Sequence, residues 1–598
     1  MSTNRVAGRA ALLAAITGLA ACASLAPGGG MRDIGGDIVG GIRVTEHRGG
    51  DDLLTAGLGL DGLRGGAPAF VDPANPSAAE LRRRAIWANW RGIADLTPQG
   101  GFGTLYGSTA AVPGREYHAF MRLPGVRHPH RVAVQVPDDF DAKRRCVVVA
   151  PASGSRGVYG AIAVAASWGL PKGCAIAYTD KGAGTDYFDL DAGRGVALDG
   201  TVREAGTAPL GFEPSTAGQG VAFKHAHSGD NPEADWGRHV RQAAEFALHA
   251  LEQAFPSQAP FRFDDTTVIA AAISNGGGAV LRAAELDGDW LDAVVAGEPN
   301  IAVRDAPPLY DLATEAALLM PCALAHLKVP VPPTAAPTCA QAGAAGWVAG
   351  ADDASRAWAT YDLLRSRGWT DEALRAGGLS VAFDLWRAVA ATYASAYGRF
   401  DAGSHPCGFR FSAVDATGAR RPASGVERAA WWADASGIPP GAGVSMLPPA
   451  DARLGGSQCL RELWTGTHPA ATRVREGIDR TRASAPRAGL PVVIVHGVDD
   501  GLVPMAFTST PYVQAARAAG RDVRFWQVER AQHFDAFLAL PGMGAAYVPL
   551  TPYVHAALDR TWAHLHDGAP LPGDARIRPT PRGTAAALDA SHLAIPGR

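Results

Sequence analysis

The sequence predicts an α/β fold in which a mostly parallel sheet is interrupted by a large, mainly helical insertion. Apolar runs without alternation, such as residues 146–150 and 492–495, are typical of strands buried on both faces of a parallel sheet. Helical patterns such as 233–255 alternate with these runs, as they do in βαβ units. The alternation stops at about residue 300 and resumes at about 490, so we expect residues 301–485 to form an inserted lid domain.

The composition places the chain among globular proteins. It has 598 residues, of which 47% are hydrophobic, and this excludes a disordered or core-poor chain. The 55 basic residues are balanced by 58 acidic ones, giving a net charge of −3 with no long run of either sign. We therefore expect no nucleic-acid partner, because such proteins carry a basic patch. There is no internal repeat and no Ser/Thr-rich linker to a polymer-binding module.

We divide the chain by composition and pattern into seven segments. The expected segments are a signal peptide with a lipobox at 1–22, a flexible Gly-rich tether at 23–50, an N-terminal extension packed on the core at 51–125, the first part of the core at 126–300, the lid domain at 301–485, the second part of the core at 486–570, and a C-terminal tail at 571–598.

The N-terminus carries an export signal. Arg5 and Arg9 precede the apolar run 10–16, which is too short to span a bilayer and has the layout of a secretory signal. Residues 19–22 resemble the lipobox of bacterial lipoproteins, in which cleavage leaves the acylated cysteine, here Cys22, as the first residue. Ordinary cleavage with an incidental Cys22 is the alternative. Both readings predict an exported protein, either secreted or attached to a membrane through lipid.

Six further cysteines permit disulfides in an exported chain. Six thiols allow 15 connectivities. We predict the pairs Cys146–Cys174, which would join two neighbouring strands, Cys322–Cys339 and Cys407–Cys459. The cysteine spacings do not resemble zinc sites.

Ser274 is the candidate nucleophile. The β-rich run 266–273 precedes it and a helical pattern follows at 278–286, so Ser274 falls on a strand-to-helix turn. Such a turn, usually G-x-S-x-G, exposes a nucleophilic serine and needs small residues two positions away on each side. Ala272 and Gly276 occupy those positions here. An ordinary Ser-Asn-Gly-Gly turn is the alternative.

Asp500 and His533 are its candidate partners. Asp500 follows the strand 492–495, and His533 follows the strand 523–528. The order Ser, Asp, His along the chain is that of α/β-hydrolases, so we predict an α/β-hydrolase-like sheet. His533 would take the serine proton, and the aspartate would fix the imidazole tautomer. Asp499 competes for the acidic role, but the spacing His-Gly-x-x-Asp before Val-Pro favours Asp500.

The oxyanion of such a reaction needs two N–H donors. One is expected from the backbone of Asn275, and the other from the loop that contains Ser153, Gly154 and Ser155. Ser155 is a rival nucleophile, although it lies at the oxyanion-loop position rather than on the elbow. Arg156 is a candidate for binding a substrate carboxylate through paired hydrogen bonds, with a structural ion pair as the alternative.

We expect neither a metal nor a cofactor. The stretch 224–227, Lys-His-Ala-His, lacks a nearby third ligand, so a polar loop is the better interpretation than a zinc site. The stretch 180–184 follows a strand but lacks the spacing of a nucleotide-binding P-loop.

Several motifs together resemble the bacterial D-(−)-3-hydroxybutyrate oligomer hydrolases. The matching stretches are DDLLTAGLG (51–59), SAAELRR (77–83), SGSRGVYG (153–160), KHAH (224–227), SNGGG (274–278) and QHFDAFL (532–538). They cover almost the whole chain. The resemblance implies that Ser274 is the nucleophile and that the substrates are short (R)-3-hydroxybutyrate esters, cleaved to monomers in polyhydroxybutyrate breakdown. The chain is shorter than that family, chiefly before His225 and in the lid.

Two other functions compete with this one. Tannases and feruloyl esterases, which cleave other small esters, place cysteines beside the catalytic serine and histidine, whereas Ile273 and Phe534 stand there in this chain. A non-catalytic binding lipoprotein would normally lack a member of the triad, and none is missing. Without a polymer-binding module, soluble oligomers suit the chain better than granules.

Overall fold

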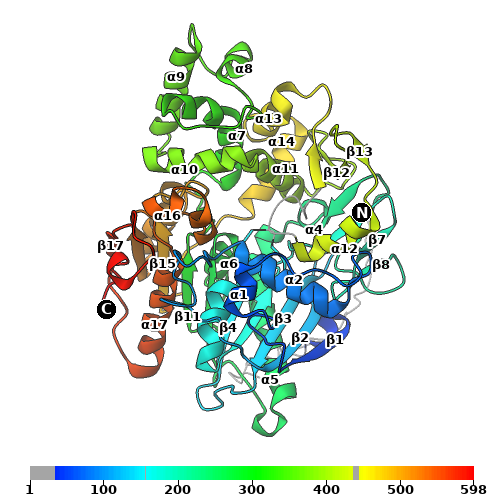
Figure 1. The fold of residues 1–598 in the computed structure, drawn as a ribbon, viewed down its shortest axis with the longest axis vertical. Helices are drawn as coiled ribbons and strands as arrows, with labels where there is room; N and C mark the ends of the chain where they lie inside the picture. The colour runs from blue at the N-terminus through cyan, green and yellow to red at the C-terminus, as the bar shows by residue number, and fades with distance from the viewer. Residues whose placement is uncertain (1–33, 155, 435–443, 598) are drawn as a thin grey trace, which may run out of the picture.

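The computed structural model describes residues 34–154, 156–434 and 444–597. Its largest sheet has ten strands in the order β1-β2-β3-β5-β4-β10-β11-β15-β16-β17 (Figure 1). Every neighbouring pair from β5 to β17 is parallel, while β1, β2 and β3 are antiparallel to their neighbours. The strands are β1 (Ile38–His47), β2 (Gly114–Met121), β3 (His130–Pro137), β4 (Cys146–Pro151), β5 (Ala175–Thr179), β10 (Thr267–Ile273), β11 (Ala293–Gly297), β15 (Val492–Gly497), β16 (Val523–Val528) and β17 (Ala575–Ile577). The predicted mostly parallel α/β sheet is confirmed.

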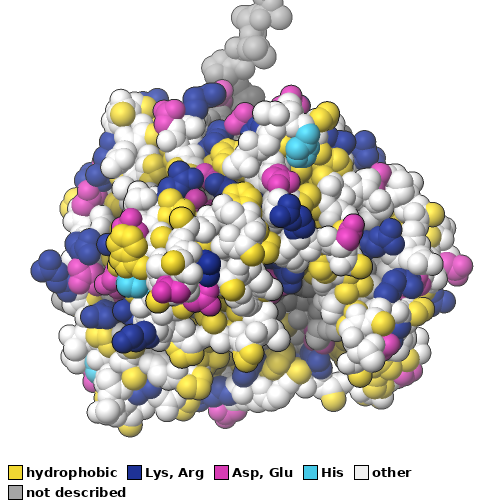
Figure 2. All heavy atoms as spheres, turned by 90° about the horizontal axis from the view of Figure 1, so that it is seen from above, with side chains coloured by type: hydrophobic (Ala, Val, Ile, Leu, Met, Phe, Trp, Pro, Cys, Tyr) yellow, Lys and Arg dark blue, Asp and Glu magenta, His cyan; other side chains and the backbone are white. Residues whose placement is uncertain are grey.

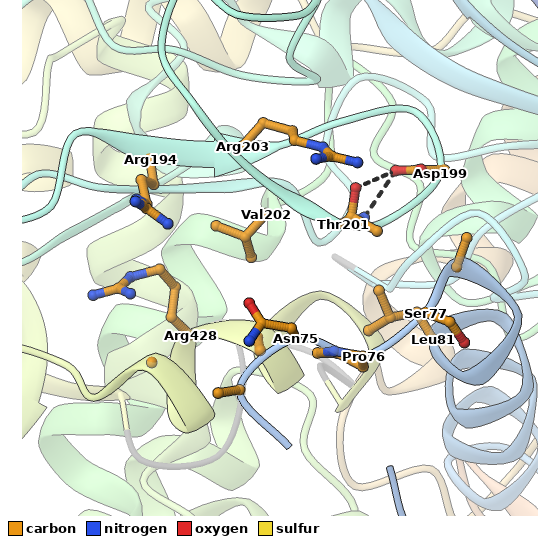
Figure 3. Close-up of a pocket in the computed structure, with 14 residues that line it drawn as sticks. Asn75, Pro76, Ser77, Leu81, Arg194, Asp199, Thr201, Val202, Arg203 and Arg428 are labelled. Atoms are coloured by element: carbon orange, nitrogen blue, oxygen red, sulfur yellow. Dashed lines mark hydrogen bonds between the residues drawn. The ribbon is translucent and has the colours of Figure 1, made fainter. Parts of the chain in front are cut away.

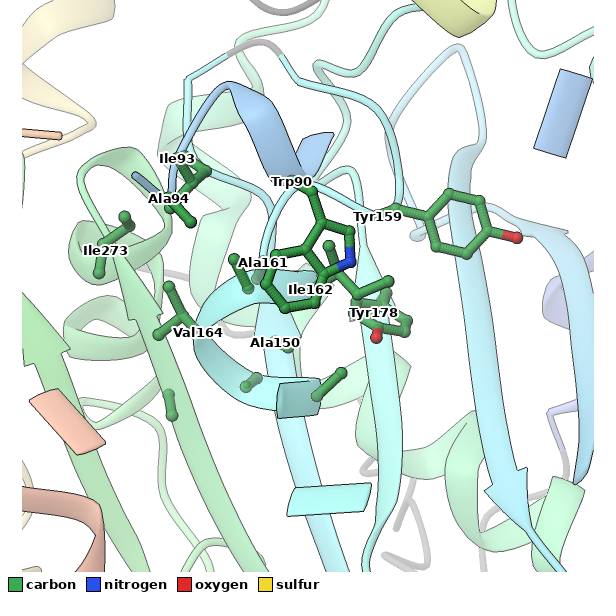
Figure 4. Packing of buried hydrophobic residues seen from close by; sticks show 14 of the residues in the cluster. Trp90, Ile93, Ala94, Ala150, Tyr159, Ala161, Ile162, Val164, Tyr178 and Ile273 are labelled. Carbon is green, nitrogen blue, oxygen red and sulfur yellow. The ribbon is translucent and has the colours of Figure 1, made fainter. Parts of the chain in front are cut away.

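Helices bury both faces of the sheet, which explains the continuous apolar runs in the sequence. Val148 and Ala150 of β4 point into one core, and Val147 and Val149 point into the other. Side chains alternate along a strand, so a strand covered on both sides needs apolar residues at every position. Figure 4 shows the first of these cores, where Trp90 packs beside Ile162. The helices on that face are α2 (Ala78–Arg91) and α17 (Thr551–Asp567), and those on the other face are α5 (Trp236–Ala254), α6 (Asn275–Ala283) and α15 (Ser509–Ala518).

The two ends of the described chain differ from our expected segments. We expected a flexible tether at 23–50, but residues 38–47 form β1, which pairs with β2 at the edge of the sheet. The glycines Gly40 and Gly41, which suggested a tether, lie where the register shifts between Val39 and Ile42, as in a β-bulge. We expected a tail at 571–598, but β17 pairs with β16, and Leu593 is buried in the main core. Short strands of three residues leave almost no periodic signal.

The predictions for residues 1–33, including the signal peptide and lipidation of Cys22, lie outside the described residues. Within the described ranges, no helix is both long enough and apolar enough to cross a membrane.

Residues 301–485 interrupt the sheet between β11 and β15 and are mainly helical (Figure 1, top). Their helices surround a separate core that includes Tyr310, Trp369 and Trp386. The helices are α7 (Leu309–His326), α8 (Cys339–Ala344), α9 (Asp353–Ser366), α10 (Asp371–Ala382), α11 (Leu385–Gly398), α12 (Gly425–Asp434), α13 (Ser457–Thr465) and α14 (Pro469–Asp479). One of them, α12, instead places Trp431 and Trp432 in a core of the main sheet. The insertion is therefore attached to the sheet by packing as well as by its two ends.

The three predicted disulfides are confirmed. Cys146–Cys174 joins the amino ends of the neighbouring strands β4 and β5, whereas Cys322–Cys339 and Cys407–Cys459 both lie in the insertion. On the face in Figure 2, acidic and basic side chains are intermixed.

Candidate active site

Ser274 lies on the sharp turn between β10 and α6. Its backbone has φ 57° and ψ −127°, a strained conformation for a residue with a side chain. The small residues that follow are required by close backbone contacts. A Cβ at position 276 would lie 2.4 Å from the Pro151 carbonyl oxygen, and one at position 278 would lie 2.0 Å from the Asn300 carbonyl oxygen. The glycines thus let the elbow fit between two neighbouring loops.

Three segments of the sheet bring Ser274, His533 and Asp500 together. His533 Nε2 lies 2.9 Å from Ser274 Oγ, and His533 Nδ1 lies 2.6 Å from Asp500 Oδ2. All three residues are at least 95% buried. The histidine therefore connects the hydroxyl to the carboxylate in a continuous hydrogen-bonded chain.

The Asp500 carboxylate is held on both oxygens. Its Oδ1 accepts the backbone N–H groups of Leu502 and Val503, each at 2.8 Å. Burial alone would raise the pKa of Asp500, but the charge of His533 and hydrogen bonds from His496 and His533 outweigh it and hold the pKa below its ordinary value. Asp500 is therefore ionised at neutral pH.

His496 is a second partner of this carboxylate that the sequence reasoning missed. Its Nε2 lies 3.3 Å from Asp500 Oδ2 and 3.0 Å from the Val503 carbonyl oxygen, so this nitrogen carries the proton. Its Nδ1 lies 2.7 Å from Ser509 Oγ, which can donate to it. The signal in the sequence was a histidine at the end of a buried strand, four positions before the predicted acid.

Asp499, the alternative acid, is not the partner of His533; that partner is Asp500. Asp499 is buried, and burial, with a smaller contribution from Glu372, raises its pKa to about 6.

Two of the predicted oxyanion elements lie beside the elbow. Asn275 is the first residue of α6, so its N–H has no acceptor within the helix. The end of β4 and the start of the loop after it lie against Gly276, since the carbonyl oxygens of Pro151 and Ala152 are close to that position. Ser153 is buried, and its Oγ has no hydrogen-bond partner among the residues that the structure describes. Lys181 Nζ donates to the Gly154 carbonyl oxygen at 2.6 Å. Ser155, as oxyanion donor or rival nucleophile, lies outside the described residues.

The Asn275 side chain joins the elbow to the insertion. Its Nδ2 donates to the hydroxyl of Tyr393 on α11 at 2.6 Å, and its Oδ1 accepts from Asn300 at 2.9 Å. The ring of Tyr393 contacts that of His225, whose Nε2 lies 2.6 Å from Glu233. His225, one of the two histidines of the 224–227 stretch, thus contacts a helix of the insertion. In the described part of the chain, no three His, Cys, Asp or Glu residues are grouped as metal ligands.

Arg156 is buried next to the loop that carries His533. Its Nη2 donates to the Gly92 carbonyl oxygen at 2.8 Å, and its guanidinium lies 5.4 Å from the centre of the Phe534 ring. The structural ion pair that we considered for Arg156 does not form with any described residue; its side chain instead donates to the carbonyl group of Gly92.

Asp535 anchors the segment after His533. Its carboxylate accepts the backbone N–H groups of Leu550 at 2.6 Å and Thr551 at 3.1 Å, at the start of α17. Burial raises the pKa of Asp535 to about 6. The residue belonged to the QHFDAFL motif, but its role depends on a contact with a distant helix that no local pattern shows.

A cavity of about 520 Å³ lies elsewhere, between the start of α2, the hairpin of β7 (Arg194–Val196) and β8 (Val202–Glu204), and α12 (Figure 3). Arg194, Arg203 and Arg428 line it, and none of the predicted site residues does.

The fold and the geometry of the site define the class of protein. A serine on a strained strand-to-helix turn, joined to a histidine and an aspartate that follow later parallel strands, is the arrangement of the α/β-hydrolases. A family model described as 3HB-oligomer hydrolase, where 3HB is 3-hydroxybutyrate, matches residues 19–596. The chain belongs to this family. It is accordingly a carboxylic ester hydrolase of the kind that cleaves 3HB oligomers.

Individual relatives agree with the family assignment. The chain is 38% identical to a D-(-)-3-hydroxybutyrate oligomer hydrolase of Burkholderia ambifaria, over 96% of this chain and 93% of that protein. It is also 38% identical to one of Burkholderia vietnamiensis, over 91% and 89% of the two chains. Among solved structures, feruloyl esterase B of Aspergillus oryzae is similar with a TM-score of 0.37 and 12% identity, over 81% of this chain and 85% of that one.

Proposed function

We propose that the chain hydrolyses short 3-hydroxybutyrate oligomers, such as dimers and trimers, through an acyl-enzyme on Ser274. The hydrogen-bonded chain from Ser274 through His533 to Asp500 carries this proposal. A serine hydroxyl is a weak nucleophile at neutral pH, and a histidine held on its other side by an ionised carboxylate is the base that activates it.

The reaction proceeds in two halves. Ser274 Oγ attacks the ester carbonyl while His533 Nε2 takes the hydroxyl proton, and Asp500 stabilises the imidazolium. The tetrahedral intermediate collapses, the ester C–O bond breaks, and His533 returns the proton to the leaving alcohol oxygen of 3-hydroxybutyrate. Water then attacks the acyl-enzyme with His533 again as the base, which releases the second product and restores Ser274.

The backbone N–H of Asn275 is the proposed first donor to the oxyanion, because it follows the nucleophile and begins α6. The loop at Ser153 and Gly154 is proposed to supply the second. Lys181 supports this role by holding the Gly154 carbonyl group, which fixes the orientation of the loop backbone.

The insertion is proposed to act as a lid, since Tyr393 of α11 reaches the residue next to the nucleophile.

We also propose that the protein is exported and that Cys22 carries lipid. The N-terminal charge and apolar pattern supports export, and so do three disulfides, which form and persist in oxidising compartments.

The test compares wild type with Ser274→Ala on the 3-hydroxybutyrate dimer and trimer and on a p-nitrophenyl butyrate control. We expect monomer release by wild type and a fall in kcat of at least about 10⁴-fold in the variant, because the nucleophile is lost. A fluorophosphonate should label wild type once, at Ser274, and should leave the variant unlabelled. An equal unfolding midpoint of the two proteins controls for misfolding. Turnover of p-nitrophenyl butyrate without turnover of the oligomers would contradict the substrate assignment.

A further inference from the structure

We propose that Arg156 binds the free carboxylate at the end of the oligomer, so that the enzyme releases 3-hydroxybutyrate from the acid end. This inference rests on the proposed function and adds to it the direction in which the substrate lies. It follows from a buried cation that has no anionic partner in the described part of the chain, from its fixed position, and from its contact with Phe534, the residue after His533.

Arg156 is buried without an anionic partner among the described residues. It is 6% exposed and its Nη1 is buried. Among the described residues, this nitrogen has no hydrogen-bond partner and no carboxylate forms an ion pair with the guanidinium. Burial lowers the pKa of Arg156 to about 10, and no neighbouring charge offsets this effect. Buried charges in proteins are normally paired, because an unpaired one loses its hydration without replacement. The unfilled donor therefore indicates an anionic ligand.

The position of the guanidinium is built into the fold. A Cβ at position 92 would lie 2.0 Å from Arg156 Nη1, so the glycine that ends α2 leaves the space in which the group sits. At the other end, the backbone N–H of Arg156 donates to the Ser153 carbonyl oxygen at 3.2 Å. The Ser153 hydroxyl is also buried, and it has no hydrogen-bond partner among the described residues. Ser153 and Arg156 thus carry two donors that nothing in the described chain satisfies.

Arg156 also packs on the loop that carries the catalytic histidine. Its guanidinium lies over the ring of Phe534, and that ring contacts His533 with centroids 4.4 Å apart. His533 has to reach the leaving oxygen to protonate it. In an oligomer cleaved at its last ester, only two carbon atoms separate that oxygen from the free carboxylate. The carboxylate of the departing monomer therefore lies on the His533 side of the reacting ester, and Arg156, which packs on the residue next to His533, is the cation that we assign to it.

The two ends of the substrate differ chemically, so a carboxylate-binding role of Arg156 can be distinguished from a purely structural one. One end of the oligomer is a hydroxyl and the other is a carboxylate, and a guanidinium forms strong, paired hydrogen bonds with a carboxylate. A purely structural Arg156, packed on Phe534 and bonded to Gly92, predicts equal effects of its loss on every ester. A carboxylate-binding Arg156 predicts effects that depend on the free acid.

The experiment compares two substrates that differ only at the acid end, the 3-hydroxybutyrate dimer and its methyl ester. We expect wild type to show a kcat/KM about 10- to 100-fold higher for the acid, mainly through KM, since one charge-assisted interaction is absent from the ester. In Arg156→Met this preference should disappear, with most of the loss on the acid. Arg203→Met, a change at an exposed arginine of the cavity in Figure 3, is the matched control and should keep the preference.

A trimer acetylated at its hydroxyl end gives an independent measurement in wild type alone. Cleavage from the acid end releases a free monomer and an acetylated dimer first, whereas an acetylated monomer as the first product would contradict the proposal. Equal kcat/KM values of wild type for acid and methyl ester, or equal losses on both in Arg156→Met, would overturn it while leaving the hydrolase function intact. No turnover of acid or ester by a wild type that cleaves p-nitrophenyl butyrate would overturn the function itself, and this inference with it.

Discussion

The sheet and the helical insertion at 301–485 place functional groups in different ways. In the sheet, Ser274, Asp500 and His533 each follow the carboxyl end of a parallel strand, so backbone geometry brings them together. The insertion has its own core and two of the three disulfides, and it reaches the elbow through the side chain of Tyr393. Changes in the sheet residues should therefore alter the chemistry, whereas changes in the insertion should alter stability or the fine positioning of the elbow.

The largest effect is expected from Asp500→Asn in the sheet. The asparagine amide can donate to His533 Nδ1, which leaves the proton on Nε2, so the imidazole cannot accept the proton of Ser274. We expect kcat for p-nitrophenyl butyrate to fall about 10⁴-fold, with a small change in KM. Asp499→Asn, one residue earlier and also buried, is the matched control and should retain most of the activity. The reverse result would give the acidic role to Asp499.

The sheet was the part of the molecule that local patterns could predict. Continuous apolar runs indicated strands that are buried on both faces of the sheet. The order of a serine, an acid and a histidine along the chain, each after a strand, predicted which three side chains meet. Topology carries this information, because parallel strands place their carboxyl ends at one edge. The catalytic roles of the three residues remain predictions.

Contacts between distant segments could not be predicted from the sequence. The Asn275–Tyr393 hydrogen bond and the Arg156–Gly92 hydrogen bond join segments with no common pattern, and each depends on how a helix packs on a loop. His496 was visible as a histidine at a strand end, but its contact with Asp500 depends on the turn that follows. The assignment of 23–50 as a tether was wrong for β1, because glycines in a bulged edge strand look like linker residues.

The second largest effect is expected on the stability of the insertion when its disulfides are removed. Cys407–Cys459 closes a loop with a separation of 52 residues, so replacing both cysteines by serine should cost about 4 kcal/mol in the chain-entropy model. Replacement of Cys322 and Cys339, with a separation of 17, should cost about 3 kcal/mol. Unfolding midpoints of both variants should fall, the first more than the second, while kcat for p-nitrophenyl butyrate at low temperature stays near that of wild type. A loss of kcat in a fully folded variant would contradict the separation of roles between sheet and insertion.

The smallest effect is expected where the two regions meet. Tyr393→Phe removes the hydroxyl that accepts from Asn275 Nδ2, so this buried donor beside the nucleophile loses that partner. Asn275 keeps its hydrogen bond from Asn300, which limits the displacement of the elbow. We expect kcat to fall by up to about tenfold, with KM for p-nitrophenyl butyrate nearly unchanged. Tyr310→Phe is the matched control, because its hydroxyl donates to the Leu460 carbonyl oxygen at 3.0 Å inside the insertion. This variant should lower the unfolding midpoint and leave kcat unaltered. If both variants have the kcat of wild type, the insertion does not act on the elbow through Tyr393, and its influence on catalysis lies in the shape that it gives to the substrate site.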